Sequence, residues 1–372
     1  MARNLLDLEA PKPARGAGAV WMQEGFATVR IAQIAPLFES VPPKYYGGTE
    51  RVVSFLTEEL VREGHDVTLF ASGDSVTRAR LIALCRRALR LDKQSVDHLA
   101  PQILLVERAY RRAAEFDVMH FHIDYLHYPV SRRQPVPQVT TLHGRLDIPE
   151  LAPLYTEFVD MPVVSISDAQ RAPLRKANWQ ATVHHGLPSD LFRFQPEPGK
   201  YLAFLGRLSP EKRVDRAIEI AKRIDMPIKI AAKVDDVDRE YFETLVEPLL
   251  DDSRVEYVGE IGEGEKQEFL GNAYALVFPI DWPEPFGLVM IEALACGTPI
   301  IAYQQGSVLE IMADGRAGFI VETIDEAVQA AARVTSLDRR LCRELFDERF
   351  TAERMAKDYV NVYEQLIERS KR

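Results

Sequence analysis

The chain alternates short apolar runs with stretches of helical periodicity, and this series begins twice. The first series starts at VRIAQIAPLF and continues through HDVTLFAS, FDVMHFHID, QVTTLHG and MPVVSIS. The second starts at YLAFLG and continues through PIKIAAK, VEYVGEI, ALVFPI and TPIIAY. Apolar runs separated by helices are typical of parallel strands that helices cover on both faces. The pattern therefore predicts an α/β chain built on doubly wound parallel sheets.

A proline-rich segment near 188–199 separates the two series and is the best candidate for a linker. The 372 residues are too many for one ordinary core and fit two domains. We therefore expect two Rossmann-like domains that face each other across a cleft, preceded by a flexible tail over residues 1–28. The last helical stretch, AERMAKDYVNVYEQLIERSKR, is amphipathic, and its pattern alone allows it to pack on either half.

Composition narrows the classes of partner. Almost all of the formal net charge of -10 falls after residue 200, and an acidic half argues against nucleic acid. No apolar run is long enough for a membrane span, and the N-terminus lacks the apolar region of a signal peptide. The arginine-rich segment from Arg78 to Arg90 is expected to be helical and leaves peripheral membrane contact open. Three widely spaced cysteines favour a reducing cytoplasm.

The segment EPFGLVMIE, residues 284–292, has a carboxylate at each end of an apolar run. If Phe286 or Gly287 opens a helix, Glu284 lies in the preceding loop and Glu292 lies one to two turns inside. The two carboxylates would then hold separate points of an elongated ligand at a strand end. The other interpretation is a helix-dipole partner and a solvated glutamate. The neighbours of Glu292 are almost all apolar, so this glutamate needs a buried partner.

The segment GRLSPEKR, residues 206–213, follows an apolar run and leads into a helical pattern. Ser209 suits a helix N-cap and Pro210 the first helical position, which places Lys212 in the first turn. Arg207 lies in the loop just before. Cations at this end of a helix oppose its dipole, so a diphosphate bound between them would explain the pattern. The alternative is a solvated pair of surface charges.

Two further patterns are weaker. Gly47 and Gly48 stand where the loop after the first run meets a helix, and glycine lets the backbone approach a phosphate closely. A Gly-Gly pair also makes an ordinary turn. The DVD at 236–238 has the form of a metal-binding carboxylate pair found in some sugar transferases, but it is interpreted as a helix cap.

Six of the eight histidines fall between positions 120 and 185. His120 and His122 share one face of an expected strand. Burial against the backbone explains His120, and a metal site of these two with Asp124 is the alternative. His122 stands near the carboxyl end of its strand, where a residue of a ligand cleft belongs.

Six segments together resemble a known family. They are YYGGTERVV, FDVMHFHID, TLHGRLD, VSISDAQR, FLGRLSPEKRVD and EPFGLVMIEALACGTPIIA. In combination they resemble the retaining nucleotide-sugar glycosyltransferases of family four (glycosyl transferases group 1), from about residue 29 to residue 365. The resemblance implies the two-domain GT-B fold. It places 29–188 with the final helix at 354–372 in an acceptor-binding domain, and 189–353 in a donor-binding domain.

The resemblance also implies residue roles. Arg207 and Lys212 would bind the donor diphosphate, Glu284 the hydroxyls of the transferred sugar, and Glu292 those of the ribose. His122 would lie beside the reacting carbon, so the catalytic set is His122, Arg207, Lys212 and Glu284. The remaining donor contacts would come from Gly47, Gly48, Gly259, Ile261, Phe286, Gly287 and Leu288.

The acceptor pocket is assigned to the loops that follow the N-terminal strands, and specifically to Tyr45, Tyr46, His143, Arg145, Asp147 and Ser167. The chain departs from the family pattern at two places. His185 stands where the interdomain element often has an asparagine, and AAKVDD replaces a common glycine turn.

The implied reaction is retaining hexosyl transfer to a hydroxyl acceptor, without metal or other cofactor. UDP-glucose is the expected donor on family frequency alone. The acceptor would attack on the face that the diphosphate leaves. The alternatives are a nucleotide-sugar epimerase or a sugar phosphorylase on the same fold, a dinucleotide-dependent oxidoreductase, and a non-enzymatic sugar-nucleotide sensor. A G-x-G-x-x-G element after the first run is missing, which disfavours the oxidoreductase.

Overall fold

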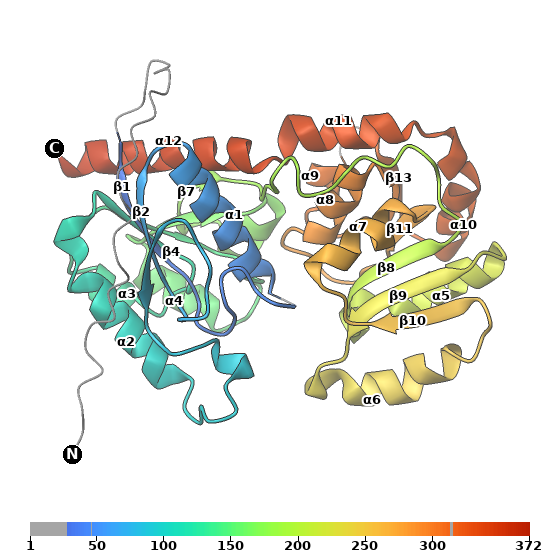
Figure 1. Cartoon of the computed structure of the whole chain (residues 1–372), viewed down its shortest axis with the longest axis horizontal. Coiled ribbons are helices and arrows are strands. Elements are labelled where there is room, and N and C mark those ends of the chain that lie inside the picture. Colours follow the sequence, from blue (N-terminus) through green and yellow to red (C-terminus); the bar gives the residue numbers. More distant parts are fainter. Residues whose placement is uncertain (1–27, 46, 313–314) are drawn as a thin grey trace.

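The structure, a computed structural model, describes residues 28–45, 47–312 and 315–372. The expected tail over 1–28 lies almost wholly outside the described residues. Two parallel sheets, each flanked by helices, form two lobes that lie side by side (Figure 1). This arrangement confirms the predicted pair of doubly wound domains.

The N-terminal lobe is built on a seven-stranded sheet in the order β3-β2-β1-β4-β5-β6-β7. β1, third in this order, is an interior strand between β2 and β4, and Ile31 to Ile34 of its run RIAQI are buried. The strands are β1 Arg30–Ile34, β2 Asp66–Ala71, β3 Arg80–Ala83, β4 Val118–Phe121, β5 Gln138–Thr141, β6 Pro162–Ser165 and β7 Asn178–Thr182. The helices are α1 Gly48–Arg62, α2 Leu99–Tyr110, α3 Tyr128–Ser131 and α4 Leu151–Glu157.

The C-terminal lobe is built on a six-stranded sheet in the order β10-β9-β8-β11-β12-β13. Its strands are β8 Leu202–Arg207, β9 Ile228–Lys233, β10 Val255–Gly259, β11 Ala275–Phe278, β12 Ile300–Tyr303 and β13 Gly318–Val321. Its helices are α5 Val214–Arg223, α6 Arg239–Tyr241, α7 Glu263–Gly271, α8 Leu288–Cys296, α9 Val308–Ile311, α10 Ile324–Arg333 and α11 Arg339–Arg349.

The last helix, α12 Ala352–Ser370, crosses from the C-terminal lobe back to the N-terminal lobe (Figure 1). Just before it, Leu187 and Thr351 form a parallel bridge, so the two connections between the lobes run side by side. Met355, Tyr359 and Tyr363 are fully buried in the core of the N-terminal lobe. The helix therefore forms part of that core.

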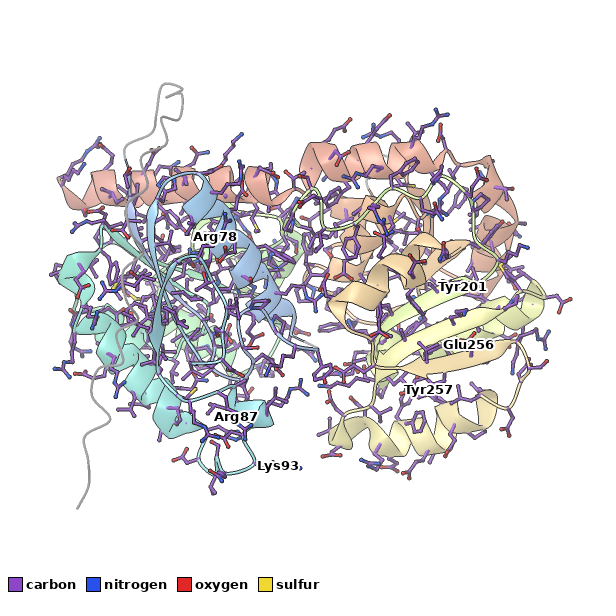
Figure 2. All side chains as sticks on the ribbon, in the orientation of Figure 1. Arg78, Arg87, Lys93, Tyr201, Glu256 and Tyr257 are labelled. Carbon is purple, nitrogen blue, oxygen red and sulfur yellow. The ribbon has the colours of Figure 1, made fainter. Side chains whose placement is uncertain are left out.

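The expectation of a helix from Arg78 to Arg90 is wrong. Arg80–Ala83 is β3, which pairs with β2 at the sheet edge, and only Leu89–Leu91 forms a short 3-10 turn. Arg78 and Arg87 accordingly lie far apart on the lobe (Figure 2). The arginines do not share one helical face. Within the described residues, no helix is both long and apolar enough to cross a membrane.

Candidate active site

A cavity of about 550 Å³ lies between the two lobes. Its wall is formed largely by the loops after β1, β5, β8, β9 and β11, at the edge where open parallel sheets bind ligands. Most of the site residues predicted from the sequence line this one cavity. They are Tyr45, Gly47, Gly48, His143, Arg145, Arg207, Lys212, Ile261, Glu284, Phe286, Gly287, Leu288 and Glu292.

Four predicted site residues do not line the cavity. Gly259 ends β10, one residue before the lining begins. His122 is buried, and it contacts a cavity residue through a hydrogen bond. Asp147 pairs with a neighbouring arginine, and the buried Ser167 accepts a backbone hydrogen bond within its own turn. Tyr46 lies outside the described residues.

The amino ends of two helices meet at the cavity. α8 begins at Leu288, just after Gly287 with its φ of 80°, and so one or two residues later than the pattern predicted. α1 begins at Gly48. A Cβ atom added to Gly48 would lie 3.5 Å from Cδ1 of Leu288, so the two helix ends approach each other across the cleft. Helix amino ends carry unpaired amides and partial positive charge, which suits a bound phosphate.

Lys212 and Glu284 form an ion pair in the cavity wall. The indole Nε1 of Trp282 donates to Oε2 of Glu284 at 3.0 Å, and the Lys212 ammonium lies 4.9 Å from the centre of the Trp282 ring. The loop of Glu284 is fixed from behind, since a Cβ atom on Gly306 would lie 2.3 Å from the Glu284 carbonyl oxygen. Sequence reasoning found the two charged residues and missed Trp282.

The helix after β8 begins later than predicted. Pro210–Lys212 is a separate 3-10 turn, Ser209 makes no side-chain cap, and α5 starts at Val214. The break falls at Arg213, which has a φ of 53° and donates to Asp215 at 2.7 Å. Lys212 therefore lies in the turn before the helix, and its ammonium points to the Glu284 loop instead of standing over the α5 dipole.

Arg207, at the end of β8, is oriented by two acidic residues. It pairs with Glu211, and its Nε lies 3.2 Å from Oδ2 of the buried Asp238. The DVD at 236–238 forms a 3-10 turn, and Asp238 holds the N-cap position of α6, as the cap interpretation predicted. Its side chain makes no cap hydrogen bond and instead faces Arg207. Burial raises the pKa of Asp238, and the adjacent Arg207 opposes that rise.

Glu292 has the buried partners that its apolar surroundings require. Its Oε1 lies 2.5 Å from Nζ of Lys266 on α7 and 3.8 Å from Nη1 of Arg51 on α1. Arg51 also forms an ion pair with Glu263, so this network joins the two lobes. Burial lowers the pKa of Lys266, which the Glu292 carboxylate opposes. The sequence indicated that Glu292 needs a buried partner, but it did not identify Arg51, Lys266 or Glu263.

A second missed cluster lies on the wall formed by the N-terminal lobe. Glu39 and Arg90 form an ion pair there, and Glu50 lies beside them in the first turn of α1. Burial, helped by the charge of Glu39, raises the pKa of Glu50 to about 7. Among the described residues, no three His, Cys, Asp or Glu side chains come together to hold a metal ion.

Two family models match consecutive parts of the chain. "Glycosyltransferase Family 4" matches residues 46–184, in the N-terminal lobe, and "Glycosyl transferases group 1" matches residues 192–344, in the C-terminal lobe. The chain is a group 1 glycosyltransferase. The family resemblance that the sequence motifs suggested is thereby confirmed. The two sheets match the GT-B fold of glycosyltransferase structures.

Curated relatives of this glycosyltransferase differ in what they transfer to. It is 39% identical over 85 residues to a probable sucrose-phosphate synthase of Thermosipho melanesiensis, which is 22% of this chain and 20% of the relative. It is 24% identical over 350 residues to the phosphatidyl-myo-inositol mannosyltransferase of Mycobacterium leprae, covering 86% of this chain and 90% of the relative. The match to the first relative thus spans only about a fifth of its length.

Solved structures share the fold of this glycosyltransferase at low identity. The sucrose-phosphate synthase of Thermosynechococcus elongatus superposes with a TM-score of 0.75 at 20% identity, covering 92% of this chain and 100% of that chain. Anabaena Alr3699/HepE in complex with UDP and glucose superposes with a TM-score of 0.70 at 16% identity, covering 91% and 100%.

The arrangement of charges in the cavity of this glycosyltransferase suits an elongated anionic ligand. Arg207, Lys212 and the two helix amino ends supply positive charge. Glu284 and Glu292 supply hydrogen-bond acceptors at two separate points. Charged hydrogen bonds of this kind are stronger inside a partly buried cleft than in water.

Proposed function

We propose that the chain moves a hexosyl group from a nucleotide diphosphate sugar to the hydroxyl group of an acceptor, with retention of configuration and without a metal ion. The single observation that carries this proposal is the shared cavity, in which Arg207 and Lys212 lie with Glu284 and Glu292. The ligand that best fits these two cations and two carboxylates has two polyols joined by a diphosphate.

Each group has one task in this proposal. Arg207 and Lys212 bind the diphosphate, which also meets the amino ends of α1 and α8. Glu284 accepts hydrogen bonds from the transferred sugar, and Glu292 accepts them from the ribose. Lys212 pairs with Glu284 and Lys266 pairs with Glu292, so these two lysines orient the carboxylate groups for the ligand.

The transfer step needs no protein nucleophile. The bond between the anomeric carbon and the phosphate oxygen breaks, and both electrons leave with the diphosphate. The acceptor oxygen attacks the same face of the sugar, and its proton passes to the departing phosphate oxygen. Negative charge grows on the diphosphate in the transition state, where Arg207 and Lys212 stabilise it.

UDP-glucose is the proposed donor. Its support is the resemblance of the fold to HepE, which was solved with UDP and glucose. A thermal-shift screen of UDP, GDP and ADP sugars, followed by transfer from the labelled donor to cell metabolites, tests the choice. Retention requires the anomeric configuration of donor and product to match by NMR. An epimerase would return a changed nucleotide sugar, and a phosphorylase would require inorganic phosphate.

Metal independence is proposed because side-chain cations stand where a metal ion would otherwise neutralise the diphosphate. Transfer is expected to continue at the same rate in excess EDTA. A loss of transfer that magnesium or manganese restores would overturn this part of the proposal. The three widely spaced cysteines favour a reducing compartment, and a cytoplasmic location is proposed on that ground.

A further inference from the structure

A fully buried glutamine, Gln33, lies in the interior strand β1 and contacts the α12 helix. Its Nε2 donates to the hydroxyl of Tyr363 on α12 at 3.1 Å. Its Oε1 lies 2.8 Å from Nε2 of His122. Buried polar atoms are rarely left unpaired, and here both halves of the amide are used. The carbonyl oxygen of Gln33 therefore faces His122.

From His122 the hydrogen bonds continue to the wall of the cavity. Nδ1 of His122 lies 2.9 Å from Nε2 of His143, and His143 lines the cavity. Nδ1 of His143 is buried and has no hydrogen-bond partner among the described residues. The ring of His185 lies nearly parallel to that of His143, with 5.4 Å between centroids, and its Nδ1 is likewise buried without a partner.

The chemistry of a neutral imidazole fixes the direction of these bonds. An amide oxygen only accepts, so Nε2 of His122 carries the ring hydrogen and its Nδ1 accepts. Nε2 of His143 must then carry a hydrogen to donate to His122. The remaining nitrogen of His143, Nδ1, presents a lone pair.

Both rings are held neutral by their surroundings. Burial lowers the pKa of His122 well below its ordinary value, and the nearby imidazoles lower it further. Burial lowers the pKa of His143 to about 3. Each ring therefore carries a single hydrogen at neutral pH. The hydrogen bonds run in one direction, from His143 to His122 and from His122 to Gln33, and this series is called the relay below.

We propose that Gln33, held by Tyr363, is a positioning residue that sets the tautomers of His122 and His143, so that Nδ1 of His143 accepts a hydrogen bond from a substrate hydroxyl. The inference rests on the proposed transfer reaction. The attacking hydroxyl gives its proton to the departing phosphate oxygen, so the hydroxyl that donates to His143 is a different one, on the transferred sugar or on the acceptor. Its hydrogen bond to His143 fixes the orientation of that substrate for the attack. The adjacent His185 offers a second nitrogen at the same wall.

Nitrogen-15 NMR of histidine-labelled full-length protein measures the tautomers directly, without any substrate. His122 and His143 are both expected as the Nε2–H form, with assignments made from single histidine replacements. Gln33→Met and Tyr363→Phe are expected to populate the Nδ1–H form of both rings. Tyr359→Phe is the matched control, because it removes an equally buried hydroxyl that bonds to Thr141 and is joined to Tyr363 only through Thr141 and His120. Its tautomers are expected to be those of the wild type.

Steady-state kinetics then shows whether the substrate hydroxyl that contacts His143 belongs to the acceptor or to the transferred sugar. Tyr363→Phe is expected to lower the rate of transfer roughly 10-fold to 100-fold while the KM for the donor stays unchanged. If the hydroxyl belongs to the acceptor, hydrolysis of the donor by water continues at the wild-type rate. If it belongs to the transferred sugar, hydrolysis falls with transfer. Either pattern supports the relay.

Two results would overturn the proposal. One is a wild-type His143 that carries its hydrogen on Nδ1. The other is a folded Gln33→Met or Tyr363→Phe protein whose tautomers and transfer rate equal those of the wild type. Tautomers as expected, in a protein that transfers no sugar from any nucleotide donor, would support the relay and overturn the proposed function.

Discussion

Lys212 combines two properties at the scale of a single residue. It is a cation in the cavity wall, and it is the ion-pair partner of Glu284. Both side chains are largely buried, at 18% and 12% exposed. A cation held in this way costs little reorganisation when negative charge grows on a leaving group.

Lys212→Met is therefore expected to lower the turnover number roughly 100-fold or more, with the melting temperature nearly unchanged. Steady-state kinetics and a thermal melt measure the two effects. Lys222→Met is the control, because Lys222 sits outside the cavity and pairs with Asp252 at 3.5 Å. Turnover that drops equally in both variants would argue against a special role for Lys212.

The raised pKa of Glu50 predicts that the free energy of unfolding depends on pH. Its pKa is raised from an ordinary value of 4.5 to about 7. Between these values the native state keeps a proton that the unfolded state has lost, so the free energy of unfolding falls as the pH rises. Glu50→Gln mimics the protonated form. It is expected to be more stable than the wild type by about 3 kcal/mol at pH 8, and equally stable near pH 4.

Urea unfolding at several pH values measures this difference. Glu63→Gln serves as a comparison, because Glu63 follows α1 away from the cavity and is less deeply buried. A gap between Glu50→Gln and the wild type that is independent of pH would contradict the raised pKa. So would a variant that is less stable at pH 8.

At the scale of elements, the sequence allowed the strands with continuous apolar runs to be predicted. It did not reveal β3, β7 and β13, which form three of the four sheet edges. RLIA and NWQAT have mixed burial, and each pairs with a neighbour on one side only. Such strands exist because a neighbouring strand offers hydrogen bonds, which local composition does not encode.

The same limit explains the site residues that sequence reasoning missed. Lys212 and Glu284 belong to short motifs, and charged residues at these spacings could be recognised as site residues from the sequence. Arg51 and Lys266 lie in ordinary helical segments, and they reach the cavity only because the two lobes fold together. The apolar setting of Glu292 predicted that a partner exists, while only the tertiary structure identifies it.

The contact between α7 and α8 depends on the buried pair of Lys266 and Glu292, whose side chains are 11% and 3% exposed. Lys266→Met leaves the Glu292 carboxylate without its nearest cation, and it is expected to destabilise the protein by about 3 kcal/mol. The double variant Lys266→Met with Glu292→Leu removes both charges and is expected to regain most of this loss. Denaturant unfolding of the four proteins in a double-mutant cycle measures the coupling.

Nucleotide affinity, measured on the same variants, distinguishes the stabilising role of the ion pair from the proposed ribose contact of Glu292. The double variant is expected to fold and to lose affinity for the donor nucleotide, since the proposed ribose contact is gone. Full nucleotide affinity in a folded double variant would exclude Glu292 as that contact. A double variant no more stable than Lys266→Met would show that the pair is not coupled.

At the scale of the whole molecule, the two lobes share one structural element. α12 starts beside the C-terminal lobe and ends in the core of the N-terminal lobe (Figure 1). The relay through Tyr363 begins on this helix, so the geometry of the cavity depends on its docking. Arg354 on the same helix donates to the backbone carbonyls of His184 and His185, at the connection between the lobes.

Truncation after Thr351 would uncover the N-terminal core. Seven apolar side chains of α12 are buried there: Met355, Ala356, Tyr359, Val360, Val362, Tyr363 and Leu366. Burial of each large apolar side chain contributes about 2 kcal/mol, so their combined loss approaches the whole stability of an ordinary domain. The truncated protein is expected to lose the cooperative unfolding of the N-terminal lobe, while the C-terminal lobe still melts cooperatively.

Removal of the exposed Ser370, Lys371 and Arg372 is the control and is expected to leave both transitions unchanged. Calorimetry distinguishes these outcomes, and two intact transitions after truncation at Thr351 would mean that α12 is not part of the N-terminal core.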